Sequence, residues 1–192
     1  MISKRLSRFS MTVTAAALVA GASADALAQK VRLATTMGDV VLELDAARAP
    51  KTVENFLQYV RSGHYGGTIF HRVIDGFMIQ GGGMTDNMSE KPTRAPIPLE
   101  SRNGLANVRG SVAMARTGVP DSATAQFFVN LKDNTFLDQP NARDGHGYAV
   151  FGRVVEGMEV VDRIKAVTTA TRPPHQNVPV TPVVIRKATL EK

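Results

Sequence analysis

Most hydrophobic positions in this sequence fall in short runs in which every second residue is apolar, the period of a β-strand. Two such runs, residues 31–35 and 40–44, flank Met37-Gly38-Asp39 and predict a β-hairpin. Gly, Asp, Asn or Pro separates the later runs of branched and aromatic residues. These runs predict strands at 69–74, 77–80, 111–115, 127–131, 148–155 and 183–190. The weakly patterned, Gly- and Pro-rich segment 81–105 indicates an ordered surface loop.

Two segments show the helical period instead. Pro50 is tolerated in the first turn of a helix, and Gly63 stands where that helix is expected to end. Between them, one apolar face is formed by Val53, Phe56, Leu57 and Val60. A shorter amphipathic helix is predicted at 158–166. About eight short strands with only two helices favour a mainly β fold, a closed eight-stranded antiparallel barrel whose ends are capped by the two helices.

The N-terminus has a different composition. Basic residues are followed by an uncharged run, 11–21, rich in Ala, Val and Leu, and then by Ala26-Leu27-Ala28, a pattern that signal peptidases accept. The apolar run is shorter than the roughly 20 residues that a spanning helix needs. We therefore predict a cleaved signal peptide at 1–28 and one domain at 29–192, exported to the periplasm. The alternative is a buried or interfacial helix.

Composition narrows the possible partners. The chain contains no Cys, so an exported domain must be stabilised by packing without disulfides. The formal net charge is +6, but the basic residues are scattered and form no Lys/Arg run. The excess is therefore expected to be solvated surface charge rather than a nucleic-acid site. We also expect a monomer with no stable membrane insertion.

The segment 70–82 carries the most specific chemistry. It combines one guanidinium, Arg72, with large apolar side chains and one amide, Gln80, and it has no nucleophile and no acid/base pair. Such residues can hold an apolar group and donate a hydrogen bond to one polar atom beside it. This predicts a reaction in which the substrate changes only its shape. The alternative is that Arg72 faces solvent or pairs with a carboxylate, while its apolar neighbours belong to the core.

Three other kinds of site lack their required patterns. The four histidines, His64, His71, His146 and His175, do not show metal-ligand spacing. Gly81-Gly82-Gly83 is not followed by the Lys-Ser/Thr of a phosphate-binding loop. The Gly-x-Ser-x-Gly motif of many hydrolases is absent. We therefore expect no metal and no cofactor.

Several motifs together resemble the cyclophilins, the proline cis/trans isomerases. They are 70–74 (FHRVI), 76–82 (GFMIQGG), 110–116 (GSVAMAR), 122–130 (SATAQFFVN), 136–138 (FLD), 148–154 (YAVFGRV) and 156–158 (EGM). The likeness covers essentially all of 31–190. The predicted signal peptide and the short loop 118–122 are similar to the periplasmic bacterial branch of that family.

The resemblance implies a peptidyl-prolyl isomerase that acts on flexible, proline-containing segments of exported proteins and assists their folding. It implies a groove on the outer surface of the barrel with Arg72 as the catalytic residue. It assigns the proline-ring pocket to Phe77, Met78, Phe128 and Leu137. It assigns the rest of the groove to His71, Gln80, Ala115, Arg116, Thr117, Gln126, Phe136 and Tyr148. Strict strand alternation would place Phe77 and Met78 on opposite faces, so both can line one pocket only where the strand is irregular.

Phe136 stands where many eukaryotic cyclophilins have tryptophan, and weak cyclosporin binding is therefore expected. Two alternatives of other classes remain open on the sequence. One is a non-catalytic peptide-binding module on the same scaffold, which could dispense with Arg72. The other is a barrel that carries a small apolar ligand inside, although bulky residues in nearly every strand favour a filled interior.

Overall fold

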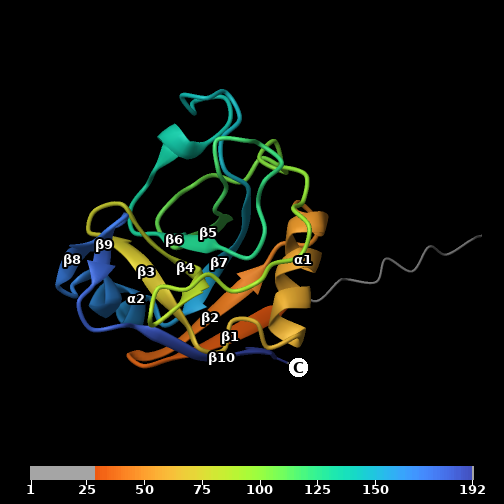
Figure 1. Cartoon of the computed structure of the whole chain (residues 1–192). Helices are drawn as coiled ribbons and strands as arrows, with labels where there is room; N and C mark the ends of the chain where they lie inside the picture. The colour runs from red at the N-terminus through yellow and green to blue at the C-terminus, as the bar shows by residue number, and fades with distance from the viewer. Residues whose placement is uncertain (1–28, 192) are drawn as a thin grey trace, which may run out of the picture.

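Eight antiparallel strands close into a barrel, and a separate two-stranded hairpin lies beside it (Figure 1). The structure, a computed structural model, describes residues 29–191; the predicted signal peptide at 1–28 and residue 192 lie outside the described residues. The elements are β1 (Lys30–Thr35), β2 (Gly38–Leu44), α1 (Pro50–Arg61), β3 (Thr68–Ile74), β4 (Met78–Thr85), β5 (Ser111–Met114), β6 (Phe127–Asn130), the 3₁₀ turn η1 (Thr135–Leu137), β7 (Val150–Glu156), α2 (Met158–Lys165), β8 (Thr169–Arg172), β9 (His175–Pro179) and β10 (Val184–Leu190). The barrel order is β1-β10-β3-β4-β6-β5-β7-β2.

The barrel and both helices confirm the predicted fold class, with two differences. β4 continues to Thr85, so the prediction that 81–105 is all loop is wrong at its start. Its glycines carry no side chain and therefore give no hydrophobic period. The β8–β9 hairpin was not predicted, because only a few of its residues are buried and no apolar face marks it. The other boundaries agree to within about two residues, the usual uncertainty of element ends.

Aromatic rings fill the interior of the barrel. The ring of Phe56, on α1, lies with its centroid 5.0 Å from that of Tyr65, 5.6 Å from Phe127 and 5.1 Å from Phe151. All four side chains are buried, and their tilted or edge-on arrangements are the favourable ones for aromatic pairs. The interior is thus packed with side chains, as expected for a small barrel, which contradicts the alternative of a ligand carried inside.

An acidic side chain from a distant loop caps helix α1. The residue before the helix, Ala49, provides no capping side chain. Instead, Glu100 accepts hydrogen bonds from the backbone N–H groups of Lys51 (3.2 Å) and Thr52 (2.8 Å), and from the Thr52 hydroxyl (2.7 Å). A carboxylate is favourable at a helix N-terminus, where N–H groups lack partners inside the helix. Glu100 thereby fastens the long 86–110 connection to α1.

Helix α2 closes the barrel on another side, away from α1 in the view of Figure 1. Val160, Val161 and Ile164 form its buried face and join the same core that Phe56 of α1 enters. The helices therefore cap one continuous core, as the sequence predicted. Within residues 29–191, no helix is long and apolar enough to cross a membrane.

Candidate active site

Strands β4, β5 and β6 bury apolar side chains on both of their faces. Ile79, Val112, Phe127 and Val129 belong to the core inside the barrel. Their sequence neighbours Met78, Ala113 and Phe128 belong to a second, smaller apolar cluster. Since side chains alternate between the two faces of a strand, this second cluster lies on the outer face of the barrel wall.

A row of four residues crosses that outer face. Arg72 on β3 is paired with Gln80 on β4, Gln80 with Phe128 on β6, and Phe128 with Ala113 on β5. Directly opposed residues of antiparallel strands share a face, with Cβ atoms about 5 Å apart. The strand register alone therefore sets a guanidinium, an amide and an aromatic ring side by side.

This row borders a depression of about 120 Å³, which we call the apolar hollow. Its lining residues are Arg72, Phe77, Met78, Gln80, Ala115, Arg116, Phe128, Leu137 and Tyr148. All nine were proposed as site residues from the sequence. They come from segments up to 76 residues apart in the chain, and the barrel brings them together.

Phe77 and Met78 both line the apolar hollow because only Met78 belongs to strand β4. Phe77 precedes the strand, in a turn, where its N–H donates to the carbonyl of Ile74 (3.1 Å). The Phe77 carbonyl accepts hydrogen bonds from the backbone N–H of Leu131 (2.9 Å) and the side-chain amide of Asn134 (2.9 Å). Strand alternation therefore does not separate the two side chains.

A β-bulge directs Arg72 outward. From the pair Phe70–Gly81 to the pair Arg72–Gln80, β3 advances two residues and β4 only one, so His71 is the extra residue. Phe70 packs inside the barrel, and Gly81 accommodates it: a Cβ on Gly81 would lie 2.9 Å from a Phe70 ring atom. Bulges often re-aim a side chain beside an active site.

The positive charge of Arg72 is not neutralised within the described chain. Among residues 29–191 it forms no ion pair, which contradicts the alternative that it pairs with a carboxylate. Its Nη1 donates a long hydrogen bond to Gln80 Oε1 (3.4 Å), and Gln80 Nε2 donates to Gln126 Oε1 (2.9 Å). Gln126 therefore does not line the apolar hollow but contacts Gln80, which does. The half-buried guanidinium keeps most of its five N–H donors available.

Arg116, by contrast, uses its guanidinium in contacts with neighbouring parts of the protein. Its side chain is only 1% exposed. Its Nε donates to the Gly147 carbonyl (2.9 Å), its Nη1 donates to the Thr117 carbonyl (3.0 Å), and its Nη2 pairs with Asp144. The hydrogen bond from Arg116 holds the pKa of Asp144 well below its usual range, with further help from backbone N–H groups. The guanidinium also lies 4.5 Å from the ring centroid of Tyr148, so it fixes that wall of the hollow.

Two other proposed groove residues lie outside the apolar hollow. The ring of Phe136 is stacked on Phe77 at a centroid distance of 5.8 Å and is 53% exposed, so it extends the apolar surface beyond the hollow. The Thr117 hydroxyl shares a hydrogen bond of 2.8 Å with the Ser122 hydroxyl. That contact lies within the 117–122 loop rather than in the hollow.

His71 lines a different depression, on the other side of Arg72, which we call the polar hollow. It measures about 400 Å³ and is lined by His71, Arg72, Gln80, Pro174, His175, Gln176 and Asn177. His71 is 5% exposed, and its Nδ1 has no hydrogen-bond partner within the described residues. Burial, with the neighbouring His175 and Arg72, lowers the pKa of His71 to about 4, so the ring is neutral at pH 7.

The model of the family described as cyclophilin type peptidyl-prolyl cis-trans isomerase/CLD matches residues 30–190. This chain belongs to the cyclophilin family.

Curated relatives agree with this assignment. The chain is 63% identical to peptidyl-prolyl cis-trans isomerase cyp18 of Streptomyces antibioticus over 159 residues, which cover 82% of this chain and 96% of the relative. It is 50% identical to peptidyl-prolyl cis-trans isomerase A of Dickeya dadantii over 191 residues, 100% of both chains. It is 52% identical to peptidyl-prolyl cis-trans isomerase B of Escherichia coli K12 over 159 residues, 82% of this chain and 97% of the relative.

A solved structure shows the same fold. The crystal structure of a cyclophilin-type peptidyl-prolyl cis-trans isomerase from Cryptosporidium parvum superposes with a TM-score of 0.71 at 27% sequence identity. The match covers 86% of this chain and 98% of that one. The protein is thus a peptidyl-prolyl cis-trans isomerase, an enzyme whose substrates are proline-containing peptides, and the alternative of a non-catalytic module is not supported.

Sequence reasoning missed a buried polar network close to the apolar hollow. Asn130 donates to Asn107 (3.2 Å) and Ser111 (2.9 Å), and Asn134 donates to Asn130 (2.7 Å). Asp138 in turn accepts hydrogen bonds from the backbone and side chain of Asn107 (2.7 and 2.8 Å). Asn134 Oδ1 has no hydrogen-bond partner within the described residues, but the other hydrogen bonds of this buried network hold the local structure in one arrangement. Through Asn134, this network holds the turn that carries Phe77, but isolated asparagines in a sequence are equally typical of surface turns.

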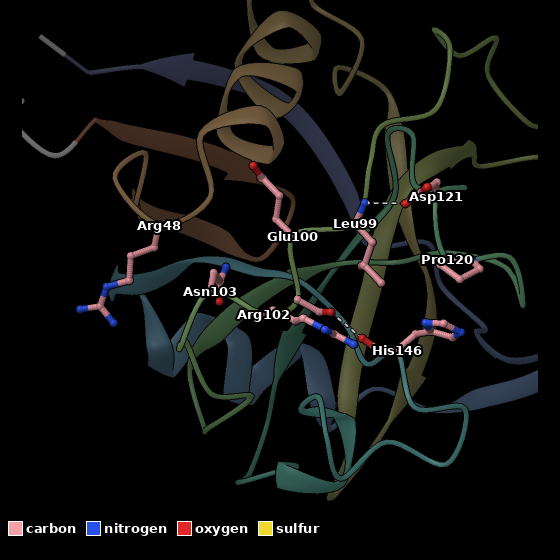
Figure 2. Close-up of a pocket in the computed structure, with 9 residues that line it drawn as sticks. Arg48, Leu99, Glu100, Arg102, Asn103, Pro120, Asp121 and His146 are labelled. Atoms are coloured by element: carbon pink, nitrogen blue, oxygen red, sulfur yellow. Dashed lines mark hydrogen bonds between the residues drawn. The ribbon is translucent and has the colours of Figure 1, made fainter.

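A wider depression of about 430 Å³ lies on the loops shown in Figure 2. Its acidic groups are already engaged: Glu100 caps α1, and Asp121 accepts a hydrogen bond from the backbone N–H of Leu99 (2.8 Å). The Ser101 hydroxyl is bonded to the carbonyl of His146. None of the residues that resemble the cyclophilin site lines it. The apolar hollow is therefore the better candidate for catalysis.

Proposed function

We propose that this cyclophilin binds the substrate proline ring in the apolar hollow and directs the Arg72 guanidinium at the nitrogen of the X–Pro bond. One observation carries the proposal: Arg72, a cation with no carboxylate partner in the described chain, lines an apolar hollow of about 120 Å³. Phe77, Met78, Phe128 and Leu137 would hold the ring. The carbonyl before the proline would rotate above them.

Physical chemistry gives Arg72 its role. Amide resonance creates a rotation barrier of about 18–20 kcal/mol, and the twisted bond loses that resonance. Its nitrogen then regains a lone pair and accepts a hydrogen bond better than in either planar state. A donor aimed at this nitrogen stabilises the transition state more than the substrate, which is the condition for catalysis. Arginine suits the role because its guanidinium is planar and remains charged.

The size of the effect limits what Arg72 supplies. Uncatalysed X–Pro isomerisation takes tens to hundreds of seconds, so a turnover near a millisecond requires a reduction of about 7 kcal/mol in the barrier. One hydrogen bond to a charged group contributes about 1.5–3 kcal/mol. The remainder must come from exclusion of water and from a site whose dipoles are already in place. The Gln80–Gln126 contact and the buried support of Arg116 provide such order.

The test is kcat/KM for a short Ala-Pro peptide, measured with a protease-coupled assay. Arg72→Ala should lower kcat/KM at least about a hundredfold, equivalent to about 2.7 kcal/mol, without changing the circular dichroism spectrum. Arg186→Ala, which removes an exposed arginine from β10, should retain wild-type activity. A folded Arg72→Ala variant with near-normal kcat/KM would rule out the proposed role.

The proposal extends to the place of action: the substrates are proline-containing segments of exported proteins in the periplasm, reached after removal of residues 1–28. The basic start, apolar run and Ala26-Leu27-Ala28 pattern support export. The Dickeya dadantii relative also aligns over the full length of both chains. Mass spectrometry of the protein from a periplasmic extract should find Gln29 as its first residue. Recovery of the unprocessed chain in the cytoplasm would contradict this.

The same proposal describes the partners: the enzyme acts as a monomer and does not bind nucleic acid. Cyclosporin should bind weakly, because Phe136 offers a smaller surface than tryptophan at the rim of the hollow. Phe136→Trp should raise the cyclosporin affinity in an inhibition titration. An unchanged affinity would show that this rim differs from that of other cyclophilins.

A further inference from the structure

The polar hollow directly adjoins the apolar hollow. Arg72 and Gln80 line both depressions, so the two hollows share a wall formed in part by these side chains. An extended polypeptide advances about 3.3–3.6 Å per residue. A chain whose proline occupies the apolar hollow would therefore reach the polar hollow within about one to three residues. The bulge at His71 makes this possible, because it places two consecutive side chains on the outer side of β3.

The chemistry of the polar hollow favours a hydrogen-bond acceptor with negative charge. None of the seven lining residues is acidic, and Arg72 brings a positive charge. The side-chain amides of Gln176 and Asn177 form no hydrogen bond within residues 29–191, so their N–H groups are available. A carboxylate gains most from such a set, because hydrogen bonds from a cation to a carboxylate are about twice as strong as neutral ones.

His71 is a second, independent indication of a ligand. Its ring is almost completely buried, yet Nδ1 has no partner within the described chain. Leaving a buried polar atom unsatisfied is unfavourable, and such atoms are often found where a function requires them.

We propose that the polar hollow is a second subsite of the substrate groove, which binds a Glu, Asp or Gln side chain about one to three residues from the proline. The inference rests on the proposed function of the apolar hollow. It makes the β8–β9 hairpin, through Gln176 and Asn177, a determinant of substrate preference. The catalytic contact of Arg72 with the X–Pro bond is unchanged, since its fork has donors for both groups.

The experiment compares kcat/KM across a set of ten-residue peptides with one central proline. Each peptide carries Glu, Gln or Lys at one of the three positions on either side, and a short Ala-Pro peptide measures basal activity. The wild-type enzyme should prefer Glu to Lys about tenfold on one side of the proline only. Gln176→Glu, which adds a carboxylate to a wall that includes Arg72, should reverse that preference once kcat/KM for each long peptide is divided by kcat/KM of the same variant for the short peptide.

Asn177→Gly refines the test. Asn177 has a positive φ of 57°, a conformation that glycine adopts readily, so the change removes the amide with little effect on the backbone. It should lower kcat/KM for the Glu and Gln peptides about three- to tenfold, the loss of one hydrogen bond. Thr171→Ala, on the same hairpin but outside the hollow, should change nothing.

The two levels of the proposal fail differently. A folded Arg72→Ala variant with near-normal activity on the short peptide would contradict the proposed function itself. Normal activity on the short peptide, with a Glu-to-Lys ratio near one at every position or a ratio that Gln176→Glu does not alter, would overturn the subsite. As a direct readout, the backbone amide resonances of 175–177 should shift when the preferred Glu peptide is added.

Discussion

Acid should destabilise this cyclophilin through His71. Burial lowers the pKa of His71 to about 4, below the ordinary value of 6.5 expected for the unfolded chain. As pH falls below 6.5, the unfolded state therefore takes up the proton while the folded state does not. The contribution of His71 to stability is complete above pH 6.5 and is lost as the pH falls toward 4.

The size of the effect follows from the two pKa values. They differ by about 2.5, and each pKa unit is worth about 1.36 kcal/mol, so the limiting loss is about 3 kcal/mol. By linkage, roughly 1 kcal/mol of this should be lost by pH 5.5 and roughly 2–3 kcal/mol by pH 4.5. The limiting loss is a large part of the free energy of unfolding of a typical domain, which is roughly 5–15 kcal/mol.

The free energy of unfolding can be measured in urea at pH 7.0, 5.5 and 4.5 for wild type and for His71→Gln. The variant should lose less stability between pH 7.0 and 4.5 than wild type, by about 2 kcal/mol. His146→Gln, which removes an exposed histidine, controls for the loss of one imidazole. Parallel stability curves for wild type and His71→Gln, or an NMR titration of the His71 ring with a midpoint near 6.5, would refute the reasoning.

Two further predictions concern residues that support the site. Glu100→Gln keeps a hydrogen-bond acceptor at the start of α1 but removes the negative charge. It should lower the free energy of unfolding, measured in urea titrations, by about 1 kcal/mol. An unchanged free energy of unfolding would mean that the charge contributes nothing. Gly83→Ala would place a Cβ against Gln126 and disturb its contact with Gln80, so kcat/KM should fall about tenfold, roughly one lost hydrogen bond. Gly118→Ala, with open space around it, is the control, and equal kcat/KM values for the two variants would contradict this role of Gln126.

The barrel itself was predictable from the sequence. Alternation marked the β1–β2 hairpin, and the spacing of the apolar positions marked α1, because one buried face gives each element a regular period. The resemblance to cyclophilins supplied the identities of the groove residues. Nine of them prove to surround one hollow, while His71, Thr117, Gln126 and Phe136 lie around it. Their individual roles in catalysis and binding stay predictions.

The remaining features depend on departures from regular periods. The extra residue at His71 shifts one strand against its neighbour, and no hydrophobic pattern along a single strand reveals such a shift. Phe77 joins Met78 in the hollow because β4 begins one residue later than predicted. The contacts of Asn107, Asn130 and Asn134 depend on tertiary structure, which single-sequence patterns do not encode.

The apolar hollow lies on the outer wall of a tightly filled barrel. This location affects which proteins can be substrates. If substrates bind in the apolar hollow, as proposed above, a polypeptide can be engaged at any internal proline, since neither a free end nor threading through an opening is required. Rotation about an existing bond releases no fragment and creates no intermediate that water could destroy. An unroofed site is therefore sufficient for this reaction, and at such a site a long, partly folded substrate would have free access to the hollow.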